Sequence, residues 1–397
     1  MTDGTRYGFQ TRSIHAGPER IGEHGAVVPP IYMTSTYAFN SVADANAVVA
    51  EESEAYIYGR ESNPTQTLLE QRIADLEGAE AGVVTASGMA AISSLFLSLL
   101  SPGDEVIVHH THYNNTAALV GEGLPRFGIK IVTADLSVPE VLTALVTPRT
   151  RMVYFETPIN PTAEVLDIAA IAAIAHRSGL RVAVDSTFAS PAVQRPLELG
   201  ADIVLHSLTK YLNGHGDILG GIVLGDEATI HRVRGVGLRY LTGATLSPMA
   251  CFLVLRGLKT LKIRMRQHAA SGLAVASMLA AHPKVRQVRY PFLPDDPGYD
   301  IAKKQMTNGS GMLSFSLQDG FEGAVRMMDR LRLIKRAVSL GDAESLIMHP
   351  ASLVMARRKI YPETPFDPGV TMELMRLSVG LEDEEDLIED LGQALGG

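Results

Sequence analysis

Short apolar runs alternate with helical patterns between about residues 63 and 225. Apolar runs without polar alternation are typical of strands that are buried on both faces. Between these runs apolar residues recur at helical spacing, and one helix is expected to begin at Asn63 and Pro64 and to end at Gly78. The alternation favours an α/β fold, with a mostly parallel sheet, right-handed crossovers and flanking helices. The expected strands are 81–86, 106–108, 129–132, 152–155, 181–185 and 203–205, and the other expected helices are 88–99 and 168–176.

After residue 225 the pattern changes to long helices with few strands. Two helices are expected at 246–262 and 265–281, and a third at 321–331. The stretch 312–317 alternates like a half-exposed strand, and 374–379 is a second expected strand. This pattern predicts a smaller C-terminal α+β domain.

The first 60 or so residues contain little regular pattern, and Pro29 and Pro30 exclude a helix at that point. A segment of this length without a core of its own is either mobile or packs on something else, such as a second subunit. We therefore divide the chain into an N-terminal arm that contacts a neighbouring subunit (1–62), a larger α/β domain (63–255) and a smaller α+β domain (256–397).

Composition narrows the class of protein. The net charge of −9 argues against a general nucleic-acid binder, which needs a basic surface. A single cysteine, Cys251, excludes an internal disulfide and a cysteine-based zinc site, and it is typical of a reducing compartment. The chain starts with polar residues and has no apolar run near the roughly 20 residues that span a bilayer. We expect a cytoplasmic protein that binds neither nucleic acid nor membrane.

Four chemically distinctive residues stand at the ends of expected strands or at the start of a helix. Lys210 and Asp185 follow two successive strands, Tyr113 follows another, and Gly88 opens a helix. The carboxyl ends of parallel strands form the crevice in which α/β proteins bind ligands. A lysine can form a Schiff base with an aldehyde, a carboxylate can hold a pyridinium proton, an aromatic ring can stack on a planar ligand, and a helix N-terminus binds phosphate. Pyridoxal 5′-phosphate (PLP) would use all four.

Other cofactors find less support. A nicotinamide cofactor needs G-x-G-x-x-G after the first strand, and this motif is absent from the sequence. His109, His110 and His112 invite a metal, but no carboxylate at ligand spacing joins them in the sequence. We therefore expect no metal site.

The candidate residues stand in a series of motifs that resembles the Cys/Met-metabolism family of fold-type I PLP-dependent enzymes over nearly the whole chain. That family includes methionine γ-lyase, cystathionine γ-lyase and cystathionine γ-synthase, and the methionine γ-lyase branch is the most similar. The motifs are Tyr58-Gly59-Arg60, Ser62-Asn63-Pro64-Thr65, Ala86-Ser87-Gly88-Met89, Glu156-Thr157-Pro158, Asn160-Pro161, Val184-Asp185-Ser186-Thr187, His206-Ser207-Leu208-Thr209-Lys210-Tyr211, Gly214-His215-Gly216-Asp217, Ala337-Val338-Ser339-Leu340-Gly341, His349-Pro350-Ala351-Ser352 and Arg376-Leu377-Ser378-Val379-Gly380-Leu381-Glu382.

The resemblance implies three catalytic roles. Lys210 would carry the cofactor as a Schiff base and then move protons between substrate carbons. Asp185 would pair with the ring nitrogen. Tyr113 would stack on the ring and act as the general acid for the leaving group.

Binding residues follow from the same resemblance. Arg376 would bind the substrate carboxylate, helped by Asn160 and Ser339. The arm would reach the active site of a neighbouring subunit, because the family typically forms a homotetramer of two catalytic dimers. The residues that would hold the phosphate are Gly88, Met89, Ser207 and Thr209 of the chain itself and Tyr58 and Arg60 of the neighbouring subunit.

The chain departs from the methionine γ-lyases at positions on the substrate side. Asn114-Asn115-Thr116 follow the stacking tyrosine, where those enzymes usually carry a cysteine, and Arg239-Tyr240 replace a Lys-Asp pair. Residues 353–357 are Leu-Val-Met-Ala-Arg, where small hydroxyl residues are usual. A methylthio group would leave the asparagine amides without a partner, and each buried unpaired group costs roughly 1–3 kcal/mol. The sequence therefore predicts a substrate other than plain methionine, with Asn115 in contact with it.

We expect a PLP-dependent γ-lyase that acts on a γ-substituted L-α-amino acid by α,γ-elimination. Canavanine, whose guanidinooxy group would leave as hydroxyguanidine, is one candidate substrate with a polar leaving group. The alternative is a γ-replacement synthase that uses an activated homoserine ester, of the cystathionine γ-synthase or O-acylhomoserine sulfhydrylase type. A non-catalytic PLP-binding protein is disfavoured because the expected catalytic groups are all present.

Overall fold

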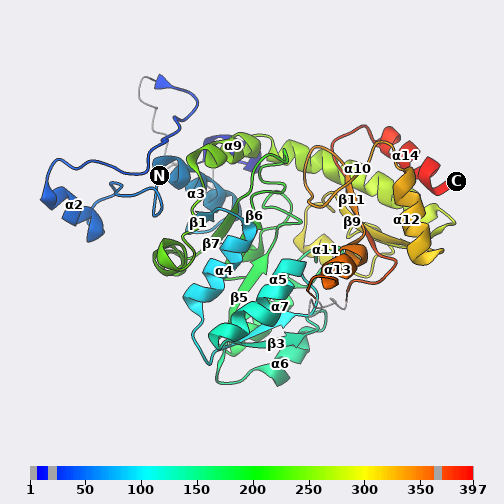
Figure 1. Ribbon diagram of the computed structural model, residues 1–397, viewed down its shortest axis with the longest axis horizontal. Helices are drawn as coiled ribbons and strands as arrows, with labels where there is room; N and C mark the ends of the chain where they lie inside the picture. The colour runs from blue at the N-terminus through cyan, green and yellow to red at the C-terminus, as the bar shows by residue number, and fades with distance from the viewer. Residues whose placement is uncertain (1–6, 17–24, 362–368, 397) are drawn as a thin grey trace.

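The computed structural model describes residues 7–16, 25–361 and 369–396 (Figure 1). Within this part of the chain the strands form two sheets, one of seven strands and one of five. Figure 1 shows the helices around the larger sheet in blue to green and those around the smaller sheet in yellow to red, at opposite ends of the molecule. The prediction of an α/β fold with a smaller C-terminal unit is confirmed.

The larger sheet carries the strand ends at which the chemically distinctive residues stand. Its members are β1 (Ala81–Thr85), β2 (Glu105–His109), β3 (Lys130–Ala134), β4 (Thr150–Glu156), β5 (Arg181–Asp185), β6 (Ile203–Ser207) and β7 (Gly221–Gly225). Their order is β1-β7-β6-β5-β4-β2-β3. Strands β2 to β6 run parallel, whereas β7 is antiparallel to both β6 and β1. Asp185 pairs with Leu205, so the end of β5 lies beside the end of β6.

Helices cover both faces of this sheet. Side chains of α3 (Pro64–Glu77), α7 (Ile168–Arg177) and α9 (Pro248–Leu258) share one hydrophobic core with the strands. Side chains of α4 (Gly88–Leu99) form a second core on strand residues that point the other way. Burial on both faces explains why the strands read as apolar runs without polar alternation.

Local capping signals explain where the helices begin and end. The side chain of Asn63 caps α3, and Gly78 ends it with a φ of 84°, as expected. The prediction of one helix over 246–262 is wrong at both ends, because Ser247 caps α9 and the chain turns before α10 (Leu261–Ala281). The predicted domain boundary after residue 255 therefore falls inside α9. Among the described residues, no helix combines the length and the apolar character that a bilayer crossing requires.

The smaller sheet has the order β10-β11-β12-β9-β8. Its strands are β8 (Val285–Arg289), β9 (Met312–Leu317), β10 (Lys335–Arg336), β11 (Leu346–Met348) and β12 (Met375–Ser378). The prediction that β9 is half exposed is wrong, because every residue of it is buried. One face of β9 is covered by α10, α12 (Gly320–Arg330) and α14 (Glu384–Gly396). Towards the larger domain, Ser314 Oγ donates a hydrogen bond to the Thr162 carbonyl at 2.7 Å.

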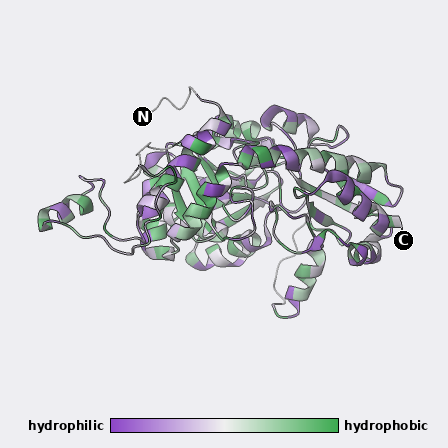
Figure 2. Cartoon of the chain, turned by 90° about the horizontal axis from the view of Figure 1, so that it is seen from above, coloured by the Kyte–Doolittle hydropathy of each residue, from purple (hydrophilic) through white to green (hydrophobic). Residues whose placement is uncertain are grey.

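The N-terminal arm contains two helices that its sequence pattern did not predict. Helix α1 (Phe9–His15) is tied to α3 by an ion pair between Arg12 and Asp75 at 2.8 Å. Helix α2 (Val42–Val49) has no buried residue, and Figures 1 and 2 show it standing away from the body of the chain. Figure 2 shows hydrophobic and hydrophilic residues on this detached segment, and Val42 and Val49 at the two ends of α2 are exposed.

Short elements connect the helices and strands named above. The π-helix η7 (Val233–Thr242) contains Arg239 and Tyr240 and was not predicted. The remaining described elements are α5 (Asn114–Ala118), η3 (Leu119–Gly123), η4 (Leu124–Phe127), η5 (Pro139–Val141), α6 (Leu142–Leu145), η6 (Pro196–Leu199), α8 (Glu227–Arg232), α11 (Tyr299–Gln305) and α13 (Pro350–Arg358).

Candidate active site

Lys210 lies in the turn just beyond β6 and reaches towards the smaller domain. Its Nζ donates a hydrogen bond to Ser339 Oγ at 2.6 Å. Burial, and to a smaller extent the guanidinium of Arg376, lower the pKa of Lys210 to about 8, while Asp342 opposes this shift. An amine with a depressed pKa is a competent nucleophile and proton carrier near neutral pH. The position and the chemistry of Lys210 therefore agree with the role predicted for it.

Asp185 ends β5, the strand next to β6. Its Oδ1 accepts a hydrogen bond from the main-chain N–H of Thr187 at 2.9 Å, and Thr187 Oγ1 accepts one from the N–H of Ser207 at 2.9 Å. Burial raises the pKa of Asp185, and no arginine or lysine of the described chain contributes to the shift. Thr187 and the charge of His206 oppose this shift. A partly buried carboxyl group without an arginine or lysine partner fits the pyridinium N–H of a bound cofactor.

The start of α4 and the end of β6 form a narrow cradle. Ser87 caps α4 with its side chain, and the N–H groups of Gly88 and Met89 lie at the helix N-terminus, where helix geometry gives them no intrahelical partner. A Cβ atom on Gly88 would lie 3.1 Å from Ser207 Oγ, so a glycine keeps the cradle open. Thr209 lies nearby in sequence, and its Oγ1 accepts an N–H from the loop before β7 at 3.1 Å. Helix N–H groups next to a serine hydroxyl suit a phosphate.

Arg376 on β12 connects the smaller sheet to this crevice. Its Nη1 donates to Asn160 Oδ1 at 2.9 Å, and its Nη2 donates to the carbonyl of Ser339 at 2.8 Å. The side chain is buried, burial lowers its pKa to about 10, and its Nε has no partner in the described part of the chain. A buried guanidinium with an unpaired N–H is suited to an incoming carboxylate.

Ser339 makes contacts with both Lys210 and Arg376. Its hydroxyl accepts from Lys210, and its carbonyl accepts from Arg376. Its φ is 86°, in the left-handed region that serine rarely adopts. Strained backbone of this kind persists where the surroundings enforce it, and it concentrates at functional sites.

Tyr113 stands at the N-cap of α5 with its side chain 38% exposed. Its main-chain N–H donates to both carboxylate oxygens of Glu156, each at 3.0 Å. The Nδ2 of Asn115 donates to the phenol oxygen of Tyr113 at 2.7 Å. Asn115 was expected to contact the substrate, and within the chain its amide contacts the phenol.

Tyr58 and Arg60 lie on the arm, and no hydrogen bond or ion pair of the described chain joins them to Lys210. Tyr58 forms an isolated bridge with Thr36, and the Arg60 guanidinium lies 5.3 Å from the centre of the Tyr58 ring. Within the described part of one chain, these two residues therefore make no hydrogen bond or ion pair with the amine at the centre of the predicted site.

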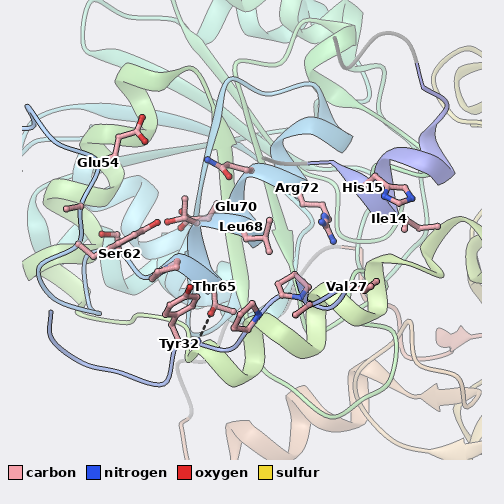
Figure 3. Close-up of a pocket in the computed structure, with 18 of the residues that line it drawn as sticks. Ile14, His15, Val27, Tyr32, Glu54, Ser62, Thr65, Leu68, Glu70 and Arg72 are labelled. Carbon is pink, nitrogen blue, oxygen red and sulfur yellow. Dashed lines mark hydrogen bonds between the residues drawn. The ribbon is translucent and has the colours of Figure 1, made fainter. Parts of the chain in front are cut away.

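A hollow of about 1270 Å³ lies between the arm and α3 rather than at Lys210 (Figure 3). Figure 3 shows Tyr32 on the arm facing Thr65 on α3, and the N–H of Tyr32 donates to Thr65 Oγ1 at 3.0 Å. Because none of the predicted catalytic residues lines this hollow, its size alone does not make it the active site.

The histidines that end β2 meet a carboxylate that the sequence did not reveal. Ligand atoms of His109, His110 and Asp135 lie within 4.8 Å of one another, so the expectation that no carboxylate joins them is wrong. Parallel pairing of β2 with β3 brings the two segments together. His109 Nδ1 already accepts the N–H of Leu136 at 3.1 Å, and burial lowers the His109 pKa to about 3. This histidine is engaged in fixing the loop after β3.

Three groups near the site were not predicted. Glu156 fixes the backbone of Tyr113, and Thr187 joins the ends of β5 and β6. Asp342 is buried, its Oδ1 has no partner among the described residues, and its charge acts on Lys210. Glu156 and Thr187 stand inside the sequence motifs and Asp342 beside one, but motif spacing does not reveal which loops meet.

Comparison with known proteins decides the family. The model of a family described as Cys/Met metabolism PLP-dependent enzyme matches residues 10–396. This chain belongs to that family. Its cofactor is therefore PLP, and the carboxyl group of Asp185, the open cradle at Gly88 and the low-pKa amine of Lys210 fit that cofactor.

Individual relatives agree with this assignment. The chain is 48% identical to L-methionine gamma-lyase of Pseudomonas putida over 388 residues, which cover 98% of this chain and 97% of that protein. It is 41% identical to O-succinylhomoserine sulfhydrylase of Pseudomonas aeruginosa, over 98% of this chain and 95% of that protein. The crystal structure of metB from Corynebacterium glutamicum matches with a TM-score of 0.92 and 37% identity, over 99% of both chains. The similarity supports a PLP-dependent carbon–heteroatom lyase of fold type I.

Proposed function

We propose that this enzyme is a γ-lyase that removes a polar γ-substituent from an L-α-amino acid. The similarity to the L-methionine gamma-lyase of Pseudomonas putida, at 48% identity, supports the γ-elimination. The residue that supports a polar substituent is Asn115. It places a side-chain amide 2.7 Å from the phenol of Tyr113, in the segment after the stacking tyrosine where the chain departs from the pattern of methionine γ-lyases.

Each residue of the site has a task in this reaction. PLP, when bound, supplies an electron sink for the bonds of the substrate α-carbon. Arg376 binds the α-carboxylate with the N–H that its contacts to Asn160 and Ser339 leave free. Lys210 takes up the α-proton with an amine whose pKa is about 8.

Three groups hold the cofactor or assist departure of the substituent. The carboxyl group of Asp185 pairs with the pyridine nitrogen, and the cradle of Gly88, Met89, Ser207 and Thr209 binds the phosphate. Tyr113 gives its phenol proton to the heteroatom as that atom leaves the γ-carbon. In this proposal every residue with a task lies in the crevice, except for residues on the arm of a neighbouring subunit.

Canavanine is the candidate substrate that this chemistry favours. Its guanidinooxy group carries N–H donors that an asparagine amide can bind, whereas a methylthio group carries none. The substituent would leave as hydroxyguanidine. Addition of water at the γ-carbon would give homoserine, and without such capture the products would be a 2-oxo acid and ammonia.

A homotetramer built from two catalytic dimers is part of the same proposal. Tyr58 and Arg60 would serve the phosphate site of a neighbour. The arm supports this, because Val27, Met33 and Val42 are exposed apolar residues that a second subunit would cover. A cytoplasmic location fits a chain with a single cysteine, which is buried.

A γ-replacement synthase is the second candidate. The relative that favours it is the O-succinylhomoserine sulfhydrylase of Pseudomonas aeruginosa, at 41% identity. In that reaction a thiol would replace the ester of an activated homoserine. The catalytic residues named above would serve both reactions, so product analysis separates them.

The test is product analysis of the PLP-loaded enzyme with methionine, homocysteine, cystathionine, O-acetylhomoserine and canavanine, each with and without an added thiol. A γ-lyase releases the γ-substituent without the thiol. Thioether formation that depends on the thiol, with no release in its absence, would identify the synthase instead. A Lys210→Ala variant controls for non-enzymatic release.

A further inference from the structure

The contact between Asn115 and Tyr113 orients the phenol group of Tyr113. Tyr113 is held at two ends: Glu156 accepts its main-chain N–H, and Asn115 donates to its phenol oxygen at 2.7 Å. The two residues stand at the first turn of α5, where the short separation in sequence keeps them together. The phenol is therefore oriented by a neighbour on its own helix.

The neighbours of the phenol determine where its proton points. Asn115 meets the phenol oxygen with an N–H, which donates and does not accept. Burial lowers the pKa of Arg376, and the electrostatic effects of Tyr113 and Tyr211 partly offset that shift. A guanidinium also offers only donors. No hydrogen bond among the described residues takes the phenol proton, so the O–H is available to donate to a ligand or to water.

We propose that Asn115 is a positioning residue that keeps the phenol proton of Tyr113 directed at the heteroatom leaving the γ-carbon. The inference rests on the proposed γ-elimination and names the substrate class within it. The site would favour γ-substituents that must be protonated in order to leave, which include a guanidinooxy group and sulfur substituents. Substituents that leave as weakly basic carboxylates would gain little from it.

The proton balance of the step is simple. A proton is lost from the β-carbon, and the electron pair of that C–H bond becomes the second bond between the β- and γ-carbons. The bond between the γ-carbon and the heteroatom breaks, its electron pair stays on the heteroatom, and that atom takes the phenol proton of Tyr113. The phenolate is stabilised by the N–H of Asn115 and by the charge of Arg376. The side chain is 38% exposed, so water can return the proton after the product has left.

A comparison of leaving groups in Asn115→Asp tests the proposal on the PLP-loaded enzyme. Aspartate keeps the shape of asparagine and suits the first turn of a helix, but it removes the N–H that the phenol accepts. We expect kcat for canavanine and homocysteine to fall by about a hundredfold, the range of one general acid. We expect kcat for O-acetylhomoserine, which releases acetate, to change by less than about threefold.

Two controls assign the effect to Tyr113. Exchange of the substrate α-proton with deuterium reports the Lys210 step and should keep its wild-type rate in Asn115→Asp. Tyr113→Phe should show the same dependence on the leaving group, and adding Asn115→Asp to it should cause no further loss. An additional loss of kcat in the double variant would overturn the proposal, because Asn115 would then assist departure of the substituent without the phenol, whereas its direct binding of the substituent changes KM.

Failure of the inference and failure of the proposed function give different results. The inference alone is overturned if the wild-type enzyme releases the substituents normally but Asn115→Asp loses the same share of kcat with all three substrates. It is also overturned if Asn115→Asp keeps the wild-type kcat with all three. Wild-type enzyme that releases none of the three substituents overturns the γ-lyase function and the inference together.

Discussion

The amine of Lys210 and the hydroxyl of Ser339 are joined by a hydrogen bond of 2.6 Å that links the two domains across the crevice. Lys210 follows the larger sheet, whereas Ser339 lies between β10 and β11 of the smaller one. Because Ser339 also binds Arg376 with its carbonyl, one strained residue positions both the proton carrier and the proposed carboxylate-binding group. The geometry of the site therefore depends on contact between the domains.

Two substitutions of Ser339 distinguish the effect of losing its hydroxyl group from the effect of relieving its backbone strain. Both Ser339→Ala and Ser339→Gly lose the hydrogen bond to Lys210, and kcat is expected to fall about tenfold in each. Only glycine relieves a φ of 86°, so Ser339→Gly should be more stable than Ser339→Ala by about 1 kcal/mol. Steady-state kinetics and urea unfolding measure the two effects. Wild-type kcat in both variants would exclude a role for the hydroxyl.

The pH dependence of stability follows from Lys210. Its pKa is about 8 in the folded chain, against an ordinary value of 10.5 for a lysine in water, so the unfolded chain binds more protons between those values. Stability contributed by this residue therefore rises with pH across that window and is lowest below it. In the cofactor-free protein, Lys210→Met should be more stable than wild type by up to about 3 kcal/mol near neutral pH, with the advantage shrinking in alkali. A difference in unfolding free energy that stays constant with pH contradicts this.

Replacement of Arg376 by lysine tests the carboxylate site. Lysine keeps the positive charge but lacks the planar guanidinium group. In Arg376 the two Nη atoms of that group contact Asn160 and Ser339, and its Nε has no partner among the described residues. We expect kcat/KM to fall by roughly a hundredfold, mainly through KM, because the interaction binds the ground state and the transition state alike. Unchanged kinetics in Arg376→Lys would mean that the substrate carboxylate binds elsewhere.

Mixed assemblies test whether the arm serves a neighbouring subunit. Lys210→Ala and Arg60→Ala are each expected to be nearly inactive. When the two variants are unfolded, mixed and refolded together, one site of a mixed dimer would combine an intact Lys210 with an intact Arg60 from the other chain. We therefore expect activity above that of either variant alone. No recovery, despite mixed assemblies seen by native mass spectrometry, would place Arg60 at the site of its own chain.

Much of the larger domain could be predicted because its strands are buried on both faces. Such strands leave continuous apolar runs, and the caps at Asn63 and Gly78 mark the limits of α3. The pattern failed for β9, where alternating serines are buried against the other domain. It also failed for the arm, because α1 and α2 are short and lack a clear apolar face.

The sequence predicted which residues form the candidate site but not which of them contact one another. Lys210, Asp185 and Gly88 could be named because strand ends and helix starts converge in a parallel sheet. The contact of Asn115 with Tyr113 and the approach of Asp135 to His109 depend on side-chain direction and on which loops meet. Neither is encoded in the spacing of residues along the chain.

The central claim is that the substituent lost from the γ-carbon is polar and must be protonated as it leaves. The most direct measurement is the ratio of kcat/KM for canavanine to kcat/KM for methionine, obtained with the same preparation of PLP-loaded enzyme. We predict a ratio of at least about one hundred, because the proposed hydrogen bonds of a polar substituent with the amide of Asn115 and the phenol of Tyr113 would together be worth about 3 kcal/mol. Rapid cleavage of methionine with no turnover of canavanine would contradict the claim.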